Sequence, residues 1–131
     1  MTNDPAVNIL YVEDDRDACE MITEFFRAIQ PNFTVKSVLN EGDALTAIAT
    51  ETFDVYVIDN WLDGTTGNVL CKKIRANDQT TPIVIYSAVA YEEDIAEGLA
   101  AGADAYLTKP NDLHNLVPTL RSLIATRTSV N

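Results

Sequence analysis

The sequence of 131 residues is poor in positive charge and in histidine. Its 9 lysines and arginines stand against 20 aspartates and glutamates, which gives a formal net charge of −11 and an isoelectric point near 4.2. Such a chain repels the phosphate backbone of nucleic acids, so direct nucleic-acid binding is not expected. The single histidine, His114, has no ligand-type neighbour in the sequence, and we expect it to face solvent near a helix start.

Cysteines and long apolar segments are equally scarce. Cys19 and Cys71 form neither a CxxC motif nor a metal-ligand spacing, and we expect both to be reduced and partly buried. The apolar runs are far shorter than the ~20 residues of a membrane-spanning helix. The first residues also lack the basic start and apolar run of a signal peptide. These absences predict one cytoplasmic domain over residues 1–131, with a core at about 7–125, no output domain and no membrane association.

Short apolar runs alternate with longer segments of helical periodicity. The runs are residues 7–12, 34–39, 53–58, 82–87 and 103–107. All but the second are nearly continuous in apolar residues, which is typical of strands covered on both faces, as in a parallel sheet. The helical stripes between them lie at 18–29, 44–49, 69–74, 95–100 and 113–124. This (βα)₅ alternation predicts an open α/β sheet with right-handed crossovers.

Glycine and proline mark the expected helix ends. Pro31 predicts the end of the first helix, and Gly102 stands where a left-handed cap would close the fourth. Pro118 interrupts the fifth stripe. Inside a helix it would cost ~3 kcal/mol or force a kink. A helix start near His114 or Asn115 would instead place it in the first turn.

Polar residues follow the strands at the edge where open α/β sheets bind ligands. They are Glu13, Asp14 and Asp15 after the first run, Asp59 after the third, Ser87 at the end of the fourth and Lys109 after the fifth. We expect Asp15 to cap the first helix or to lie in its first turn. With strand order 2-1-3-4-5 the first and third strands are neighbours, so Glu13, Asp14 and Asp59 converge. Carboxylates that converge repel one another unless a proton or a cation relieves the repulsion.

This acidic group suits one chemistry in particular. Hard oxygen ligands with open positions favour Mg²⁺, which readily takes a phosphate oxygen as a further ligand. A carboxylate is then a competent nucleophile toward phosphorus, because the metal neutralises the incoming oxygens. Lys109 supplies a positive charge and the Ser87 hydroxyl a hydrogen bond. The residues therefore predict phosphoryl transfer to Asp59.

Four stretches give the chain a resemblance to a known family. They read ILYVEDD at 9–15, FDVYVID at 53–59, PIVIYSA at 82–88 and GADAYLTKP at 102–110. In this order and spacing the chain resembles the receiver (CheY-like response regulator) domain of two-component phosphorelay signalling, along roughly residues 7–125. The resemblance implies a flavodoxin-like (βα)₅ fold, with a doubly wound five-stranded parallel sheet in the order 2-1-3-4-5.

The resemblance also implies a role for individual residues. They are Asp59 as phosphoacceptor, Glu13, Asp14, Asp59 and the backbone carbonyl of Trp61 as Mg²⁺ ligands, Lys109 and Ser87 as assisting groups, and Ser87 with Tyr106 as the switch. Mn²⁺ is the alternative metal. In the family, the aromatic residue at Tyr106 turns inward when the hydroxyl residue moves to the phosphoryl group. The Lys109–Pro110 peptide bond is expected to be cis, a geometry largely reserved for proline.

Three positions depart from the family pattern. Glu13 replaces the commoner aspartate, which lengthens one arm of the acid pair and keeps its charge. Asp63 stands where a proline is often found, and it adds negative charge beside the site. Trp61 is bulky at a position that lines the entry to the acid, so we expect it to influence the rates of phosphorylation and hydrolysis.

The predicted function is that of a switch and not of an enzyme with a separate substrate. A histidine kinase or histidine phosphotransfer protein donates the phosphoryl group, and Asp59 takes it up and loses it again in self-catalysed steps. Contacts with an unidentified downstream protein then change. Homodimerisation through the fourth helix, fifth strand and fifth helix is left open by the resemblance. The alternative is a receiver-like binding module that acts without phosphorylation, although the complete set of acids, hydroxyl and lysine argues against it.

Two other classes fit the sequence poorly. A haloacid-dehalogenase-like phosphotransferase needs a second acid two residues after its nucleophile, where Trp61 stands. A flavodoxin-like carrier of FMN needs phosphate donors in the first loop, where Glu13, Asp14 and Asp15 would repel a phosphate.

Overall fold

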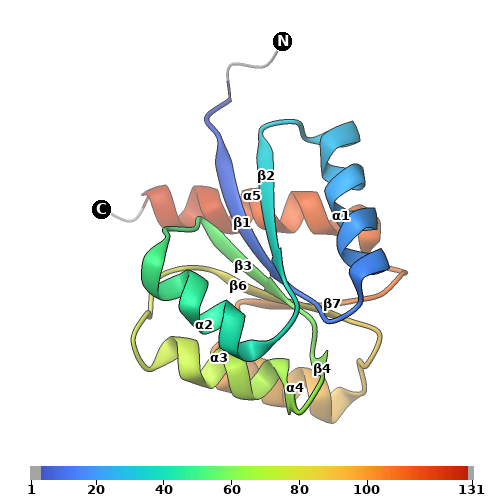
Figure 1. The fold of residues 1–131 in the computed structure, drawn as a ribbon, viewed down its shortest axis with the longest axis vertical. Coiled ribbons are helices and arrows are strands. Elements are labelled where there is room, and N and C mark those ends of the chain that lie inside the picture. Colours follow the sequence, from blue (N-terminus) through green and yellow to red (C-terminus); the bar gives the residue numbers. More distant parts are fainter. Residues whose placement is uncertain (1–3, 130–131) are drawn as a thin grey trace.

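A parallel sheet with helices on both faces forms the body of the molecule, described for residues 4–129 by a computed structural model (Figure 1). The five strands have the order β2-β1-β3-β6-β7, and all neighbours are parallel. Their bounds are β1 Val7–Val12, β2 Phe33–Val38, β3 Val55–Ile58, β6 Ile83–Ser87 and β7 Ala105–Thr108. Strands β4 and β5 lie outside this sheet, so its five strands are numbered one to five as β1, β2, β3, β6 and β7. In that numbering the order is the predicted 2-1-3-4-5, and the predicted doubly wound sheet is confirmed.

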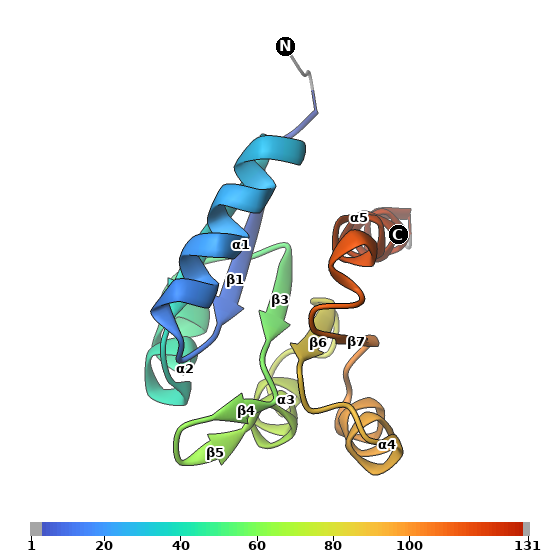
Figure 2. The same ribbon diagram turned by 90° about the vertical axis from the view of Figure 1, so that its right-hand side faces the viewer.

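The helices lie in two layers. They are α1 Arg16–Ile29, α2 Glu41–Thr50, α3 Gly67–Arg75, α4 Glu92–Ala101 and α5 Leu113–Ser129. Helices α1 and α5 cover one face of the sheet, and α2, α3 and α4 cover the other (Figure 2). Within the described residues, no helix combines the length and the apolar character needed to cross a membrane.

The apolar runs are continuous because the central strands contribute to two cores. Ile9 and Tyr11 of β1 pack with α1 and α5, whereas Leu10 and Val12 pack with the helices of the other layer. Successive side chains of a strand point to opposite faces, so a strand between two helical layers is apolar at nearly every position. The second run is mixed because β2 lies at the edge of the sheet, where several of its side chains are exposed.

A short antiparallel hairpin follows β3 and was not expected from the sequence. Its strands are β4 Trp61–Leu62 and β5 Thr65–Thr66, and Trp61 pairs with Thr66. Gly64 takes a positive φ of 78° at the turn between them. The hairpin places Trp61 at the end of the sheet where β3 stops, two residues past Asp59.

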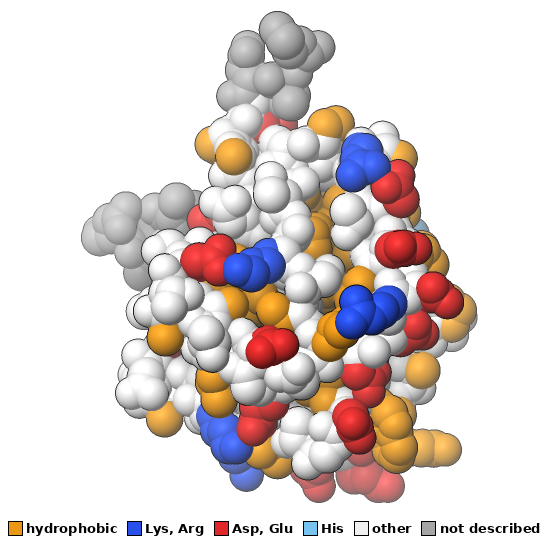
Figure 3. Space-filling view, viewed as in Figure 1, with side chains coloured by type: hydrophobic (Ala, Val, Ile, Leu, Met, Phe, Trp, Pro, Cys, Tyr) orange, Lys and Arg blue, Asp and Glu red, His pale blue; other side chains and the backbone are white. Residues whose placement is uncertain are grey.

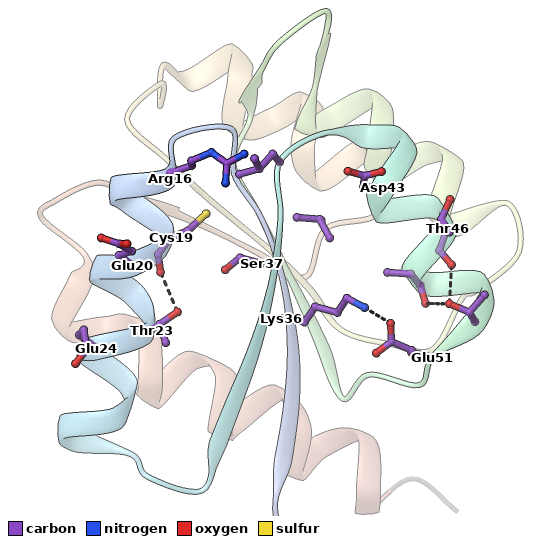
Figure 4. Close-up of a pocket in the computed structure, with 14 residues that line it drawn as sticks. Arg16, Cys19, Glu20, Thr23, Glu24, Lys36, Ser37, Asp43, Thr46 and Glu51 are labelled. Atoms are coloured by element: carbon purple, nitrogen blue, oxygen red, sulfur yellow. Dashed lines mark hydrogen bonds and ion pairs between the residues drawn. The ribbon is translucent and has the colours of Figure 1, made fainter.

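The edge strand β2 forms the floor of a groove of about 950 Å³ between α1 and α2. Hydrophobic side chains show at the bottom of this hollow and charged ones around it (Figure 3). An ion pair joins Lys36 to Glu51 across one part of the groove, and Cys19 and Ser37 point into it (Figure 4). Cys19 and Cys71 are both free, as expected, and both are more buried than the sequence predicted.

The helix ends agree with the sequence, and the structure decides between the two positions left open for Pro118. Gly102 caps α4 in the left-handed region with φ 117°, and the exposed His114 lies near the start of α5. Helix α5 already begins at Leu113, so Pro118 lies inside the helix and not in its first turn. Proline has no N–H with which to bind the carbonyl of His114, so the helix lacks one hydrogen bond there.

The two glycines at 102 and 42 give a matched test of this cap. Gly102→Ala is expected to lower the free energy of unfolding by about 1–2 kcal/mol, because a side chain is strained in the left-handed region. Its Cβ would also stand 2.6 Å from Cγ of Arg75. Gly42→Ala lies within α2, where the added Cβ would meet only Oδ1 of Asn40, at 3.4 Å. It is expected to raise stability by up to about 1 kcal/mol. Urea denaturation of both variants measures the difference, and effects of the same sign would contradict this account.

Candidate functional site

Three of the predicted site residues lie just beyond strand ends, where backbone hydrogen bonds extend the sheet. The N–H of Glu13 donates to the last carbonyl of β2 at 3.0 Å, and the N–H of Asp59 to the last carbonyl of β1 at 2.9 Å. The N–H of Lys109 donates to the last carbonyl of β6, also at 2.9 Å. The sheet therefore fixes the backbone of all three residues at one edge.

Three carboxyl groups converge at this edge, as the sequence predicted. Glu13, Asp14 and Asp59 each offer an oxygen, and these oxygens lie within 4.8 Å of one another. Glu13 and Asp59 are 2% and 7% exposed, whereas Asp14 is open to solvent. The donor set is all oxygen and one side remains accessible, so the group fits a small hard cation that keeps part of its water. Among the described residues, this is the one cluster with such geometry.

Asp15 lies next to the cluster but has a different task. Its side chain accepts a hydrogen bond from the N–H of Asp17 at 2.9 Å and caps the start of α1. The prediction of a capping acid is confirmed. Capping aligns the helix so that Glu13 and Asp14 fill the short connection between β1 and α1.

Lys109 provides the positive charge of the cluster. Its Nζ forms an ion pair with Oε1 of Glu13 and lies 3.7 Å from Oδ2 of Asp59. The side chain is largely buried, and Nζ stands 5.4 Å from the centre of the Tyr86 ring, within the range of a cation–π contact. The Lys109–Pro110 peptide bond is cis, as the resemblance implied.

One lysine does not compensate the whole acidic group. Burial, together with the nearby Asp59, raises the pKa of Glu13 from its ordinary value of 4.5 to about 7. Lys109 acts in the opposite direction and does not prevail, because desolvation of the carboxylate is the larger effect. Without a bound metal ion, the cluster therefore keeps a proton as pH rises until about pH 7.

A cavity of about 450 Å³ opens beside Asp59. Its lining contains the carboxyl cluster, Lys109, Trp61, Ser87 and Val89 among others. This cavity is smaller than the groove at β2, but only here do the carboxylates and the lysine converge. Its chemistry, and not its size, therefore identifies it as the candidate site.

Two groups in this lining hydrogen-bond to fixed partners. The N–H of Trp61 donates to Oδ1 of Asp59 at 3.2 Å, while the indole is 69% exposed at the mouth. The fully buried Ser87 accepts a hydrogen bond from the N–H of Val89 through its Oγ, at 3.2 Å. Each predicted residue of the site thus lies at the cavity except Tyr106, which reaches Val89 from outside it.

Tyr106 brings in two residues that the sequence did not single out. Its hydroxyl donates to the carbonyl of Val89 and accepts a hydrogen bond from Nδ2 of Asn60 at 3.2 Å. Asn60 is a buried polar residue directly after Asp59, between β3 and the buried Leu62. A buried amide inside an apolar stretch is the signal that could have identified it, because such a group needs hydrogen-bond partners.

The chain belongs to the response regulator receiver domain family, since the model of that family matches residues 9–121. Among curated relatives, response regulator ArlR of Staphylococcus epidermidis is 34% identical over 118 residues, which is 89% of this chain and 52% of ArlR. Transcriptional regulatory protein CseB of Streptomyces coelicolor is 33% identical over 120 residues, 89% of this chain and 49% of CseB. The chain therefore spans about half the length of these curated relatives.

Solved receiver domains show the same fold. The receiver domain of the Francisella response regulator 1452 superposes with a TM-score of 0.83 and 30% identity, over 92% of this chain and 98% of that one. The receiver domain of the sensor histidine kinase PA1611 from Pseudomonas aeruginosa PAO1 gives a TM-score of 0.81 and 26% identity, with the same coverage. That structure contains a magnesium ion coordinated in the active site cleft. The chain is thus a receiver domain of two-component signalling.

The raised pKa of Glu13 predicts a pH dependence of stability in the metal-free protein. Between pH 4.5 and 7 the folded state keeps a proton on Glu13 that the unfolded state has lost. The free energy of unfolding therefore falls as pH rises through this window, by on the order of 3 kcal/mol. Glu13→Gln cannot titrate and should lack this component.

Urea denaturation of both proteins in a chelating buffer, at a series of pH values, measures this component. The stability of the wild type relative to Glu13→Gln is expected to decline from acid to neutral pH. A relative stability that stays constant or rises would contradict the assigned environment of Glu13.

Proposed function

We propose that Asp59 accepts a phosphoryl group from a phosphohistidine and thereby changes the contacts of the domain with a downstream protein. The donor is a histidine kinase or a histidine phosphotransfer protein, and the reaction depends on Mg²⁺. The observation that carries this proposal is the convergence of Glu13, Asp14 and Asp59 within 4.8 Å, with the Nζ of Lys109 beside them. Membership in the receiver family supports it.

Glu13, Asp14 and Asp59 would hold the Mg²⁺ ion, and the backbone carbonyl of Trp61 is assigned as a further ligand. Their oxygens are the donors that Mg²⁺ prefers, and the exposed side of the cluster leaves positions for water and phosphate. The magnesium ion in the similar PA1611 receiver domain supports this assignment. When bound, the ion neutralises charge on the phosphoryl oxygens. Mn²⁺ prefers the same type of ligand and stays an alternative.

The carboxylate of Asp59 is the nucleophile in this proposal. One of its oxygens forms a bond to phosphorus, the bond from phosphorus to the imidazole nitrogen of the donor breaks, and that nitrogen keeps the electron pair. Lys109 lies 3.7 Å from Oδ2 of Asp59 and offers its ammonium group to a phosphoryl oxygen. The hydroxyl of Ser87 accepts from Val89, and its own proton can be donated to another phosphoryl oxygen.

The later loss of the phosphoryl group is a hydrolysis that the domain performs on itself. Water must reach the phosphorus through the mouth of the cavity, where the exposed indole of Trp61 stands. Trp61 is therefore placed to influence this rate. Location in the cytoplasm and homodimerisation through the face of α4, β7 and α5 stay predictions.

Phosphorylation of Asp59 is tested by intact-mass measurement after incubation with Mg²⁺ and acetyl phosphate. The wild type is expected to gain one phosphoryl group and Asp59→Asn none, because an amide is not a nucleophile for this transfer. Asp63→Asn serves as a control, since it removes a nearby exposed acid outside the cluster. A wild type that takes up no phosphoryl group, from either this donor or a cognate kinase, would favour a module that binds partners without phosphorylation.

Magnesium is expected to raise the melting temperature, because it relieves the repulsion among the three carboxylates of the folded state. A ligand at 100 times its Kd stabilises a protein by about 2.7 kcal/mol. Asp14→Ala removes the exposed member of the cluster and should abolish most of the shift, whereas Asp63→Ala should leave it intact. Thermal denaturation with and without millimolar Mg²⁺ measures this. Equal shifts in the two variants would place the metal elsewhere.

A further inference from the structure

Both the nitrogen and the oxygen of the buried Asn60 side-chain amide are hydrogen-bonded. The side chain is only 6% exposed. Its Nδ2 donates to the hydroxyl of Tyr106 at 3.2 Å, and its Oδ1 accepts from the N–H of Asn68 at 3.0 Å. Release of either partner would leave a buried polar group without a hydrogen bond, which is costly. Asn60 is therefore held in one orientation, and it holds the hydroxyl of Tyr106 in turn.

Val89 is hydrogen-bonded through both its N–H and its carbonyl, to Ser87 and to Tyr106. Its N–H donates to Oγ of Ser87, which lines the cavity beside Asp59. Its carbonyl accepts from the hydroxyl of Tyr106, which Asn60 holds. Two routes thus approach Val89 from the site. One is Ser87, which lines the same cavity as Asp59, and the other is Tyr106, which is hydrogen-bonded to Asn60, the residue that follows Asp59.

The ring of Tyr106 packs against Gly98, where any other residue would bring a side chain into contact with the ring. A Cβ at residue 98 would lie 2.9 Å from Cδ2 of Tyr106 and 2.9 Å from Cδ1 of Ile85. Such distances are shorter than van der Waals contact, so a side chain there would displace the ring. The position of Tyr106 is therefore determined by the packing at Gly98 and by hydrogen bonds at its hydroxyl.

We infer that Asn60 is a positioning residue that couples Tyr106, and through it the segment 88–91, to the reaction at Asp59. A phosphoryl group on Asp59 brings acceptor oxygens to the hydroxyl of Ser87, which then gives up its hydrogen bond from Val89. The hydrogen bonds from Asn60 to Tyr106 and from Tyr106 to Val89 limit how far the carbonyl of Val89 moves in response. The meaning of this coupling rests on the proposed function, whereas the contact between Asn60 and Tyr106 exists without phosphate.

The segment 88–91 ends at an exposed surface at the start of α4. Tyr91 is 72% exposed and directly precedes α4, where it serves as the N-terminal cap position. The helix itself carries the exposed Leu99. A shift of Val89 would therefore act on the exposed start of α4, at Tyr91.

A merely structural role for Asn60 is the competing account. Asn68 lies in the first turn of α3, and Oδ1 of Asn60 satisfies its N–H. If this were the whole role, Asn60→Ala would weaken the protein to the same extent whether or not residue 106 has a hydroxyl. A direct contact makes the two effects depend on each other.

A double-mutant cycle separates these accounts. Asn60→Ala, Tyr106→Phe and the double variant are unfolded in urea without Mg²⁺ or phosphodonor. The two single changes in the unfolding equilibrium constant are expected to be non-additive by roughly threefold to tenfold, the worth of one hydrogen bond. Additive effects would overturn the contact. This result does not depend on phosphorylation.

The coupling is tested with protein carrying ¹³C-labelled tyrosine rings and a ¹⁵N-labelled backbone. The ring signal of Tyr106 is identified by its loss in Tyr106→Phe. In wild type, Mg²⁺ with beryllofluoride, a phosphoryl analogue, is expected to shift the signals of both Tyr106 and the Val89 amide. In Asn60→Ala, the Tyr106 signal should be displaced already in the unmodified protein, and beryllofluoride should move it much less. The Val89 amide should still respond, because Ser87 is intact.

Asn77→Ala serves as a control, since it makes the same substitution at an exposed site. It should leave the Tyr106 signal and its response unchanged. An Asn60→Ala protein with the wild-type Tyr106 signal and response would overturn the inference. A wild type that fails to respond to beryllofluoride would overturn the coupling together with the proposed function, whereas an additive cycle would overturn the contact and this inference but leave the proposed function standing.

Discussion

Repulsion among carboxylates held at one edge of the sheet is the constraint on which the site depends. Main-chain hydrogen bonds to neighbouring strands fix Glu13 and Asp59, so neither residue can move away from the other without breaking the sheet. Both are buried, and Lys109 compensates only part of their charge. The fold therefore maintains a local excess of negative charge that a cation or a proton must relieve. The backbone hydrogen bonds that stabilise the sheet therefore also hold the reactive carboxylate of Asp59 close to other negative charges.

The sequence predicted the layers and the strand order well because burial leaves a direct mark on composition. The first apolar run coincides with β1, but each of the other four extends past its strand at one end, by one or two residues. Phe53 and Ala103 are both buried, yet they lie just before β3 and β7. Apolar patterns report burial, whereas a strand is defined by hydrogen bonds, so the two differ where a connection packs onto the core. The acids and the lysine were predictable because the strand order alone brings them to one edge.

The hydrogen bonds of Asn60 and Val89 were not predictable from sequence. They join residues that are distant along the chain, and they depend on the direction of side chains that the strand order does not specify. The β4–β5 hairpin was not predicted either, because strands of two residues are too short to show a periodic pattern. The sequence left two positions open for Pro118, because helix starts are set by local backbone contacts such as the hydrogen bond from the N–H of Leu113 to the carbonyl of Pro110. Sequence reasoning thus located the reactive groups but not the bonds that connect them to the rest of the molecule.

The hairpin also gives the molecule an optical property. Trp61 is the single tryptophan of the chain, and its main-chain N–H is bound to the carboxylate of Asp59 while its indole stands at the mouth of the cavity. Any event that changes the charge of that carboxylate also changes the electric field around the indole. Tryptophan emission therefore arises from one chromophore beside the reactive acid, and the domain contains a built-in reporter that needs no dye.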